Sequence, residues 1–228
     1  MTWVLRWLRT SLGSKVVMAV TGLLLFFFLV GHMAGNLLVF RGQQAMNDYA
    51  YFLQHSTGLL WTARLGLLAL FALHVAIGLR LTRDNRGARP ERYAHEDTVQ
   101  ASFASRSMIL SGLVVAAFLV YHLAHFTLGW IQSGNYALRD ATGRHDVYTM
   151  VVLGFRNPVV ALSYVVAVLL LGLHLSHGLQ SLFQSLGLRH RRYSPLIGTA
   201  APIVAALLVA GFLSVPFSVL LGIVQPPQ

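Results

Sequence analysis

The chain has 228 residues, of which 56% are hydrophobic and only 11% are charged, and its formal net charge is +10. Soluble domains carry roughly a quarter charged residues, so this composition excludes an ordinary water-facing surface and favours membrane lipid as the surroundings. The chain contains no cysteine. That excludes disulfides, iron–sulfur clusters held by this chain and thioether-linked haem.

Five stretches with few or no charged side chains are long enough to cross a hydrocarbon core of about 30 Å as helices. We therefore predict an all-α integral membrane protein with a single membrane domain over residues 1–228. Arg64 is the one charge inside these stretches, and every Asp and Glu lies in a loop. The lack of membrane carboxylates weakens a proton pump or cation transporter. The helices are expected at residues 16–40, 59–79, 107–131, 158–186 and 196–224.

The basic residues concentrate in alternate loops, as the positive-inside rule describes for membrane proteins. They do not form one face, which argues against nucleic acid as a partner. The asymmetry predicts a multi-pass protein of the bacterial cytoplasmic membrane, with the N-terminus inside and, after an odd number of spans, the C-terminus outside. The inner side carries Arg6, Arg9, Lys15, Arg80, Arg83, Arg86, Arg89, Arg92, Arg106, Arg189, Arg191 and Arg192, and the outer side carries Arg41, Arg64, Arg139, Arg144 and Arg156.

The connections between the spans differ in composition. Residues 1–15 form a short basic, amphipathic segment, and the span that follows is too long for the apolar part of a signal peptide. The first two and the next two helices each form a hairpin with one central histidine per helix, which is a weak internal repeat. The connections are expected at Arg41–Gly58 and Gln132–Asn157 outside, and at Thr82–Arg106 and Gly187–Pro195 inside.

Each of the first four spans contains one central histidine: His32, His74, His122 and His174. Ionisable residues at membrane depth cost free energy, and they usually mark function. With a rise of about 1.5 Å per residue, His32 and His122 lie roughly 4–6 Å to the outer side of the centre. His74 and His174 lie roughly 4–7 Å to the cytoplasmic side. Two levels about 10–12 Å apart result, each with one histidine from each of two helices.

Two neutral imidazoles that face each other across a bundle are suitable axial ligands for a low-spin haem iron. The pattern predicts that the first four helices form a haem-binding bundle with two haem b groups, which would carry electrons across the membrane. The iron ligands would be His32 with His122 and His74 with His174. The alternative is that each histidine makes a hydrogen bond between helices, which explains one histidine more easily than four at two matched depths.

Other residues near these levels have more than one interpretation. His125 and His177 follow the central histidines of their helices by three positions and share a face with them, so they are alternative ligands, propionate partners or packing residues. Arg64 is a natural partner for an outer propionate. Gly31 and Gly35 allow either close helix packing or the approach of a flat macrocycle. The remaining histidines fall in loops, where we expect them to be solvated: His55, His95, His145 and His190.

Short motifs around these histidines carry a resemblance that covers nearly the whole chain. They are residues 15–22 (KVVMAVTG), 31–37 (GHMAGNL), 60–64 (LWTAR), 88–90 (ARP) with Tyr93, 121–126 (YHLAHF) and 173–178 (LHLSHG). Together with five spans, they resemble the single-chain, di-haem cytochrome b subunit of bacterial succinate:quinone oxidoreductases, a family that includes fumarate reductases.

The resemblance implies that His32 and His122 ligate a distal haem b, and that His74 and His174 ligate a proximal one. It implies two cytoplasmic partners, a flavoprotein that performs the dicarboxylate chemistry and an iron–sulfur protein, docked on residues 82–106 and 189–192. Electrons would pass from the clusters through both haems to a quinone, expected to be menaquinone. The chain would then be the membrane subunit of a respiratory succinate dehydrogenase or fumarate reductase.

Three alternatives stay open at this point. Another di-haem quinone cytochrome, such as the membrane subunit of a formate dehydrogenase or hydrogenase, differs mainly in its soluble partner. A haem-free transporter would use the histidines as a proton relay, and a haem-free anchor would only tether a soluble enzyme. For a quinone site near the outer haem, Asp48, Asp140 and Asp146 are candidate proton donors, and nothing in the sequence selects one.

Overall fold

The computed structural model describes residues 3–8, 10–88 and 103–227, and this part of the chain consists of helices and loops without a named strand. The all-α prediction is confirmed. Several sequence expectations fall outside the described residues: those for Arg9, Arg89, Pro90, Arg92, Tyr93, His95 and most of the inner loop. The helices are α1 (Trp3–Leu8), α2 (Ser11–Asn36), η1 (Leu37–Arg41), α3 (Gln43–His55), α4 (Thr57–Gly87), α5 (Phe103–Arg106), α6 (Met108–His122), η2 (Leu123–Thr127), α7 (Ser133–Tyr136), α8 (Val147–Arg156), α9 (Pro158–Ser185) and α10 (Ser194–Leu220).

Five helical segments in the described residues are long and apolar enough to cross a membrane, as predicted. The chain therefore has the architecture of a multi-pass membrane protein. The first two segments extend beyond the predicted bounds at both ends, because their helices continue into the polar connections. The fourth agrees within one residue, and the third and fifth end four residues before the predicted ends. The segments are Ser11–Arg41, Thr57–Gly87, Met108–Thr127, Pro158–Ser185 and Ser194–Leu220.

The predicted end of the third span, at residue 131, was wrong by several residues. Helix α6 passes at its end into one π-helical turn, η2, and the chain leaves the helix at Leu128. The backbone N–H of Trp130 then turns back to the carbonyl of Ala124, at 2.9 Å. Gly129 has a φ of +64°, and a Cβ atom there would collide with the ring of Tyr136. The positive φ of Gly129, which favours glycine, therefore ends this helix before the apolar part of its sequence ends.

The start of the fourth span agrees with the prediction, and its local cause is visible. Asn157 is the N-cap of α9, and its side-chain oxygen accepts a hydrogen bond from the backbone N–H of Val159 at 3.0 Å. Pro158 occupies the first helical turn, where the missing N–H costs nothing. The cap and the proline together set the point at which the chain enters this span.

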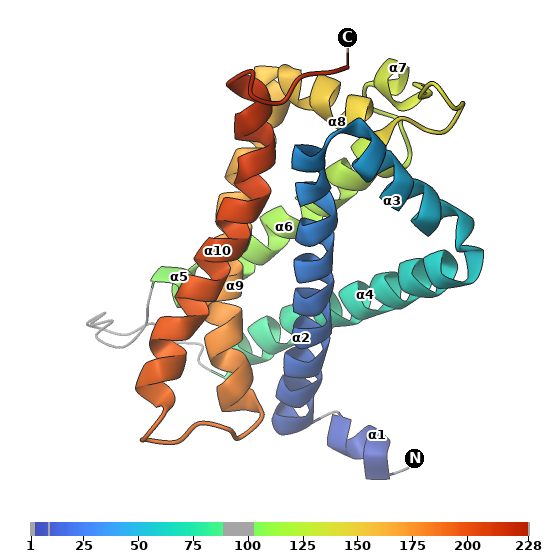
Figure 1. Cartoon of the computed structure of the whole chain (residues 1–228). Helices are drawn as coiled ribbons and strands as arrows, with labels where there is room; N and C mark the ends of the chain where they lie inside the picture. Colours follow the sequence, from blue (N-terminus) through green and yellow to red (C-terminus); the bar gives the residue numbers. More distant parts are fainter. Residues whose placement is uncertain (1–2, 9, 89–102, 228) are drawn as a thin grey trace.

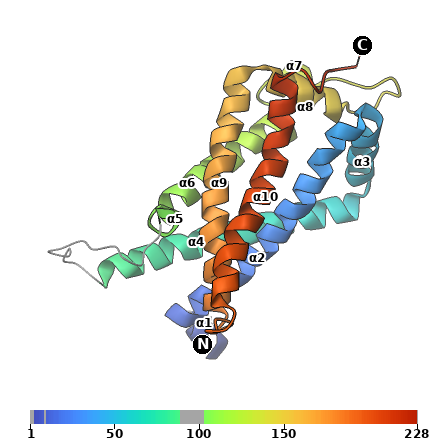
Figure 2. The ribbon, with the colours of Figure 1, turned by 60° about the vertical axis from the view of Figure 1, so that its left-hand side comes forward.

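The long helices do not form a regular parallel bundle. Helices α9 and α10 lie side by side along much of their length, whereas α4 and α6 run obliquely across the other helices (Figures 1 and 2). Helix α2 packs against both α4 and α9, and α6 packs mainly against α9. The fifth long helix, α10, is thus a full packing partner of α9, and its Gly211 lies directly against Met33 of α2.

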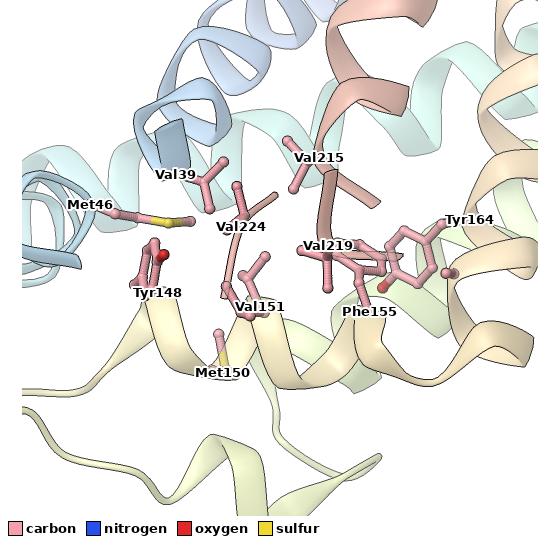
Figure 3. Close-up of a cluster of buried hydrophobic side chains, with 12 residues drawn as sticks. Val39, Met46, Tyr148, Met150, Val151, Phe155, Tyr164, Val215, Val219 and Val224 are labelled. Carbon is pink, nitrogen blue, oxygen red and sulfur yellow. The ribbon is translucent and has the colours of Figure 1, made fainter. Parts of the chain in front are cut away.

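The main hydrophobic core lies at one end of the molecule, which we call the outer cap after the side that the distribution of basic residues predicts for it. There, η1, α3, α8, the start of α9, the end of α10 and the C-terminal tail meet (Figure 3). The sequence reading treated these connections as loops, and it missed helices α3 and α8. The buried residues of the outer cap are Val39, Met46, Tyr148, Met150, Val151, Val152, Phe155, Ala161, Tyr164, Val215, Val219 and Val224.

Two of the long helices contribute few buried side chains. Helix α4 has no fully buried residue, and α6 has only Ser111. The buried hydrophobic cluster lies in the outer cap, whereas the four central histidines lie outside that cluster and are only partly buried.

Candidate functional site

The structure brings the four central histidines together in the two predicted pairs. His32 of α2 and His122 of α6 have ring centroids 5.8 Å apart, at an interplanar angle of 80°. His74 of α4 and His174 of α9 have centroids 6.3 Å apart, at 67°. Each pair therefore joins two different helices, and each joins one helix of the first hairpin to one of the second.

The spacing within each pair fits a metal ion held between two imidazoles. Metal–nitrogen distances of about 2 Å place the centres of two trans imidazole rings about 6 Å apart. The described residues contain no group of three or more His, Cys, Asp or Glu side chains arranged to hold a metal ion. Two nitrogen donors suit a prosthetic group that brings its own equatorial ligands, as haem does, better than a cage made of protein ligands.

We call His74 and His174 the inner pair, after their predicted depth. In this pair, hydroxyl groups orient both imidazole rings. Thr21 donates its hydroxyl proton to a carbonyl of its own helix at 2.8 Å, and its oxygen lies 3.1 Å from Nδ1 of His74. Ser111 likewise donates within α6 at 3.1 Å and lies 3.4 Å from Nδ1 of His174. Because each hydroxyl has already donated its proton, each Nδ1 carries hydrogen and donates to it. The lone pair of both rings is then on Nε2, the nitrogen that a haem iron needs.

A glycine beside each hydroxyl lets the histidine approach the neighbouring helix. A Cβ atom at Gly22 would lie 3.2 Å from Cε1 of His74, and one at Gly112 would lie 3.2 Å from Cε1 of His174. These contacts reveal a repeat that our reading of the sequence missed. The repeat consists of a methionine, two further residues, a threonine or serine, a glycine and a leucine. It begins at Met18 and again at Met108, and each copy lies the same number of residues before the central histidine of its helix.

We call His32 and His122 the outer pair, after their predicted depth. Aromatic rings lie against both histidines of this pair. His32 stacks on Phe28, with centroids 5.4 Å apart, and Phe212 of α10 lies 5.9 Å away. Nδ1 of His122 lies 3.4 Å from the hydroxyl of Tyr164, a residue of the outer cap. Asn36 donates to the backbone carbonyl of His32 at 2.8 Å, and its amide also lies 3.4 Å from Nε2. A ligand to that nitrogen would have to displace this second, longer contact.

The two additional histidines have different surroundings. His125 is 2% exposed, and its Nδ1 and Nε2 each lie 3.0 Å from a protein oxygen, on Tyr164 and Gln132 respectively. His177 contacts Ser181 in its own helix, with 2.9 Å between Nε2 and Oγ. Because both nitrogens of His125 are engaged, it has none left for an iron or a propionate in this arrangement.

The other residues predicted near the haems are Arg64, Gly31 and Gly35, and each has different surroundings. Arg64 is exposed, and its guanidinium lies 5.4 Å from the ring centre of Trp61. Gly31 is exposed, and a Cβ atom there would meet nothing within 4 Å, so no neighbouring helix requires a glycine at this position. At Gly35 a Cβ atom would lie 2.7 Å from the ring of Tyr49, so that glycine makes room for α3.

The three candidate proton donors are held as structural carboxylates. Arg144 bridges Asp48 and Asp140, at 2.6 and 3.0 Å. Hydrogen bonds from Thr142 and Arg144 lower the pKa of Asp140 well below its ordinary value of 3.8. The structure therefore favours an ionised Asp140, which is a poor proton donor at neutral pH.

Asp146 is the N-cap of α8, and it is buried. Burial raises its pKa, but hydrogen bonds from Thr149, Asn47 and Gln43 outweigh this effect, so the pKa lies below 3.8. The carboxylate therefore ties α3 to α8 and stabilises the outer cap.

One loop histidine differs from the expectation of full solvation. His145 is partly buried, its ring lies 4.7 Å from that of Tyr136, and its Nε2 is buried without a hydrogen-bond partner in the described residues. Burial lowers the pKa of His145, so it is neutral at neutral pH. The expectation fails because α7 folds back over the loop. His55 and His190 are exposed, as expected.

A hollow lined by Arg189, His190, Arg191, Ser194 and Pro195 lies at the turn between α9 and α10. These residues include most of the basic turn that was expected to dock a partner.

Comparisons with protein-family models, with characterised proteins and with solved structures found no match to this chain.

Proposed function

We propose that the chain is the membrane subunit of a succinate:quinone oxidoreductase and holds two haem b groups. The observation that carries the proposal is the presence of two separate histidine pairs, with ring centroids 5.8 and 6.3 Å apart, in a five-span helical protein. Four unrelated interhelical hydrogen bonds would not require the histidines to face one another in pairs. The motif resemblance supports the same assignment.

In this proposal, the chain's own residues hold and orient the cofactors. His32 and His122 would hold the outer haem, and His74 and His174 would hold the inner haem. A haem iron with two imidazole ligands has no open coordination position, so it supplies one-electron transfer and not oxygen binding. Thr21 and Ser111 keep the Nδ1 protons of the inner pair directed away from the metal position.

The resemblance implies the partners. It supports the proposal that a cytoplasmic flavoprotein carries out the dicarboxylate chemistry, and that an iron–sulfur protein passes electrons to the inner haem. The chain itself has no cysteine for an iron–sulfur cluster and no dinucleotide-binding motif. The basic turn at Arg189–Arg192 would contribute to the docking surface. A membrane quinone, proposed to be menaquinone, would exchange electrons with the outer haem.

The test is a dithionite-reduced minus oxidised spectrum of the purified membrane complex, with haem measured per chain as the pyridine derivative. We expect two b haems per chain. The control is His55→Ala, because this exposed histidine contacts the ring and the carbonyl of Tyr51 in its own helix, and its loss should leave the haem content unchanged. A haem-free complex that still reduces quinone would overturn the proposal and leave a simple anchor, and a haem-free, inactive chain would favour the transporter.

The identity of the soluble partner needs a separate measurement. The proposal predicts that a flavoprotein and a cysteine-rich iron–sulfur protein co-purify with the chain, and that succinate reduces the haems. Reduction by formate or hydrogen, with no response to succinate, would instead identify the di-haem subunit of another dehydrogenase.

A further inference from the structure

We propose that Tyr164 and His125 fix which nitrogen of His122 faces the metal, and that they thereby set the affinity and potential of the outer haem. This inference rests on the proposed haem ligation, and it assigns roles to two positioning residues. We call the hydrogen-bonded series from His122 through Tyr164 and His125 to Gln132 the outer relay. It joins α6, α9 and the loop after η2.

The direction of the outer relay can be worked out from its far end. The side-chain oxygen of Gln132 accepts a hydrogen bond from the amide of Asn135 at 3.2 Å, and it lies 3.0 Å from Nε2 of His125. An amide oxygen can only accept, so Nε2 of His125 carries hydrogen. His125 is almost fully buried and has no carboxylate partner in the described residues, so the neutral ring is favoured over the imidazolium.

A neutral ring with hydrogen on Nε2 has its lone pair on Nδ1. Nδ1 of His125 lies 3.0 Å from the hydroxyl of Tyr164, so the tyrosine donates to it. The tyrosine oxygen is then left to accept, and Nδ1 of His122 lies 3.4 Å away. His122 therefore carries its proton on Nδ1, and its lone pair is on Nε2. The side-chain amide of Gln132, in the loop after η2, thus determines which nitrogen of His122 carries the proton.

The outer relay is held rigidly. Tyr164 is 6% exposed and packs edge-on against Phe155 and Phe118, at 5.0 and 4.9 Å between centroids. His125 stacks on Phe126 at 3.9 Å. Gln132 is the non-glycine residue with a positive φ, 53°, in the described chain. Such a conformation is unfavourable for a residue with a Cβ atom, and it persists where the surrounding structure requires it. These constraints keep the amide oxygen of Gln132 directed at His125.

The second hairpin offers a matched control. His177 follows His174 as His125 follows His122, but it contacts Ser181 of its own helix and has no hydrogen bond to Tyr164 or to the inner ligands. A substitution at His177 removes a comparable side chain without breaking the outer relay. If proximity to a haem alone mattered, the two histidines would behave alike.

The decisive experiment compares Tyr164→Phe, His125→Leu and the double variant in the purified full complex. When a metal ligand loses the hydrogen-bonding partner of its second nitrogen, the metal affinity of the site typically falls 10- to 100-fold. We therefore expect the variants to lose the outer haem 10- to 100-fold faster to a haem-free acceptor protein. We also expect a higher midpoint potential, because loss of the acceptor at Nδ1 makes His122 a weaker donor to oxidised iron.

Several readouts separate this role from mere packing. The inner haem of the same molecules reports whether the variants fold, and its content and potential should not change. His125→Gln retains an acceptor and a donor, and it should restore much of the wild-type behaviour. Because His125 acts through Tyr164, His125→Leu should add nothing in the Tyr164→Phe background. His177→Leu should leave the outer haem as it is in the wild type.

The outcomes distinguish the relay from the proposed function itself. A wild-type complex without haem would overturn the proposed function before any variant is compared. A wild-type complex with two haems, combined with unchanged outer haem in His125→Leu, would overturn the relay alone. Additive effects of the two single substitutions would also overturn it, because they would mean that His125 does not act through Tyr164.

Discussion

The outer histidine pair, His32 with His122, and the inner pair, His74 with His174, have similar ring separations but different support. At the inner pair, support comes from hydroxyls and glycines on the faces of α2 and α6. At the outer pair, it comes from stacked aromatic rings and from a tyrosine of the outer cap.

The difference shows that one ligand geometry can be built in two ways. The inner support is local, because each hydroxyl belongs to the same hairpin as the histidine that it orients, and so it is repeated along the sequence. The outer support depends on the outer cap, where segments far apart in the chain meet. We therefore expect the inner site to respond to single helix-face substitutions and the outer site to respond to the cap.

The largest effect is expected from removing a ligand. His122→Ala should abolish the outer haem and His74→Ala the inner haem, because an iron held by one remaining imidazole loses half of its protein ligands. Each variant should therefore contain one haem per chain, measured as the pyridine derivative. Loss of both haems from either variant would show that the two sites are not independent, and loss of neither would remove the histidine from the ligand set.

The next effect separates the two kinds of support. Thr21→Val keeps the shape of the side chain but removes the acceptor for His74, and Ser111→Ala does the same for His174. Each should speed the loss of the inner haem at least about tenfold and leave the outer haem unchanged. Thr21→Ser, which keeps the hydroxyl, is the control. Equal effects on both haems would indicate a general loss of packing instead.

A smaller effect concerns the stability of the outer cap. The folded-state pKa of Asp146 lies below 3.8, so its carboxylate contributes stability that is complete above about pH 5 and is lost as the pH falls through the folded pKa. The melting temperature of the purified chain should therefore drop between pH 5 and pH 3. Asp146→Asn retains an N-cap oxygen but does not titrate, so its drop should be smaller. Parallel curves for the two proteins would contradict this assignment.

The smallest effects are expected at two glycines of α2. Gly35→Ala would place its Cβ 2.7 Å from the ring of Tyr49, and the resulting strain of about 1–3 kcal/mol should exceed the gain in helix propensity of about 1 kcal/mol. Gly31→Ala meets no neighbour within 4 Å, so it should leave the chain as stable or slightly more stable. Thermal melting of both variants is the measurement. A Gly35→Ala variant as stable as Gly31→Ala would show that α3 can move away from α2.

The sequence by itself determined the membrane class, the number of spans and the pairing of the central histidines. Hydropathy reports spans because apolar length must match the bilayer, and the fixed rise of a helix converts residue numbers into depth. The repeat around Thr21 and Ser111 was also present in the sequence, but its meaning appears only once His74 and His174 are seen beside it. That the histidines hold haem stays a prediction.

Only the tertiary structure decided the outer cap and the surroundings of His125. Helix α8 is too short to stand out by hydropathy, and its cap Asp146 contacts Asn47, which lies far away in the sequence. The same holds for His125 and Tyr164, whose hydrogen bond joins α9 to the turn after α6. Hydropathy and helix periodicity describe neighbours within a segment. Hydrogen bonds between distant segments depend on how those segments pack, and that packing is not encoded in any one of them.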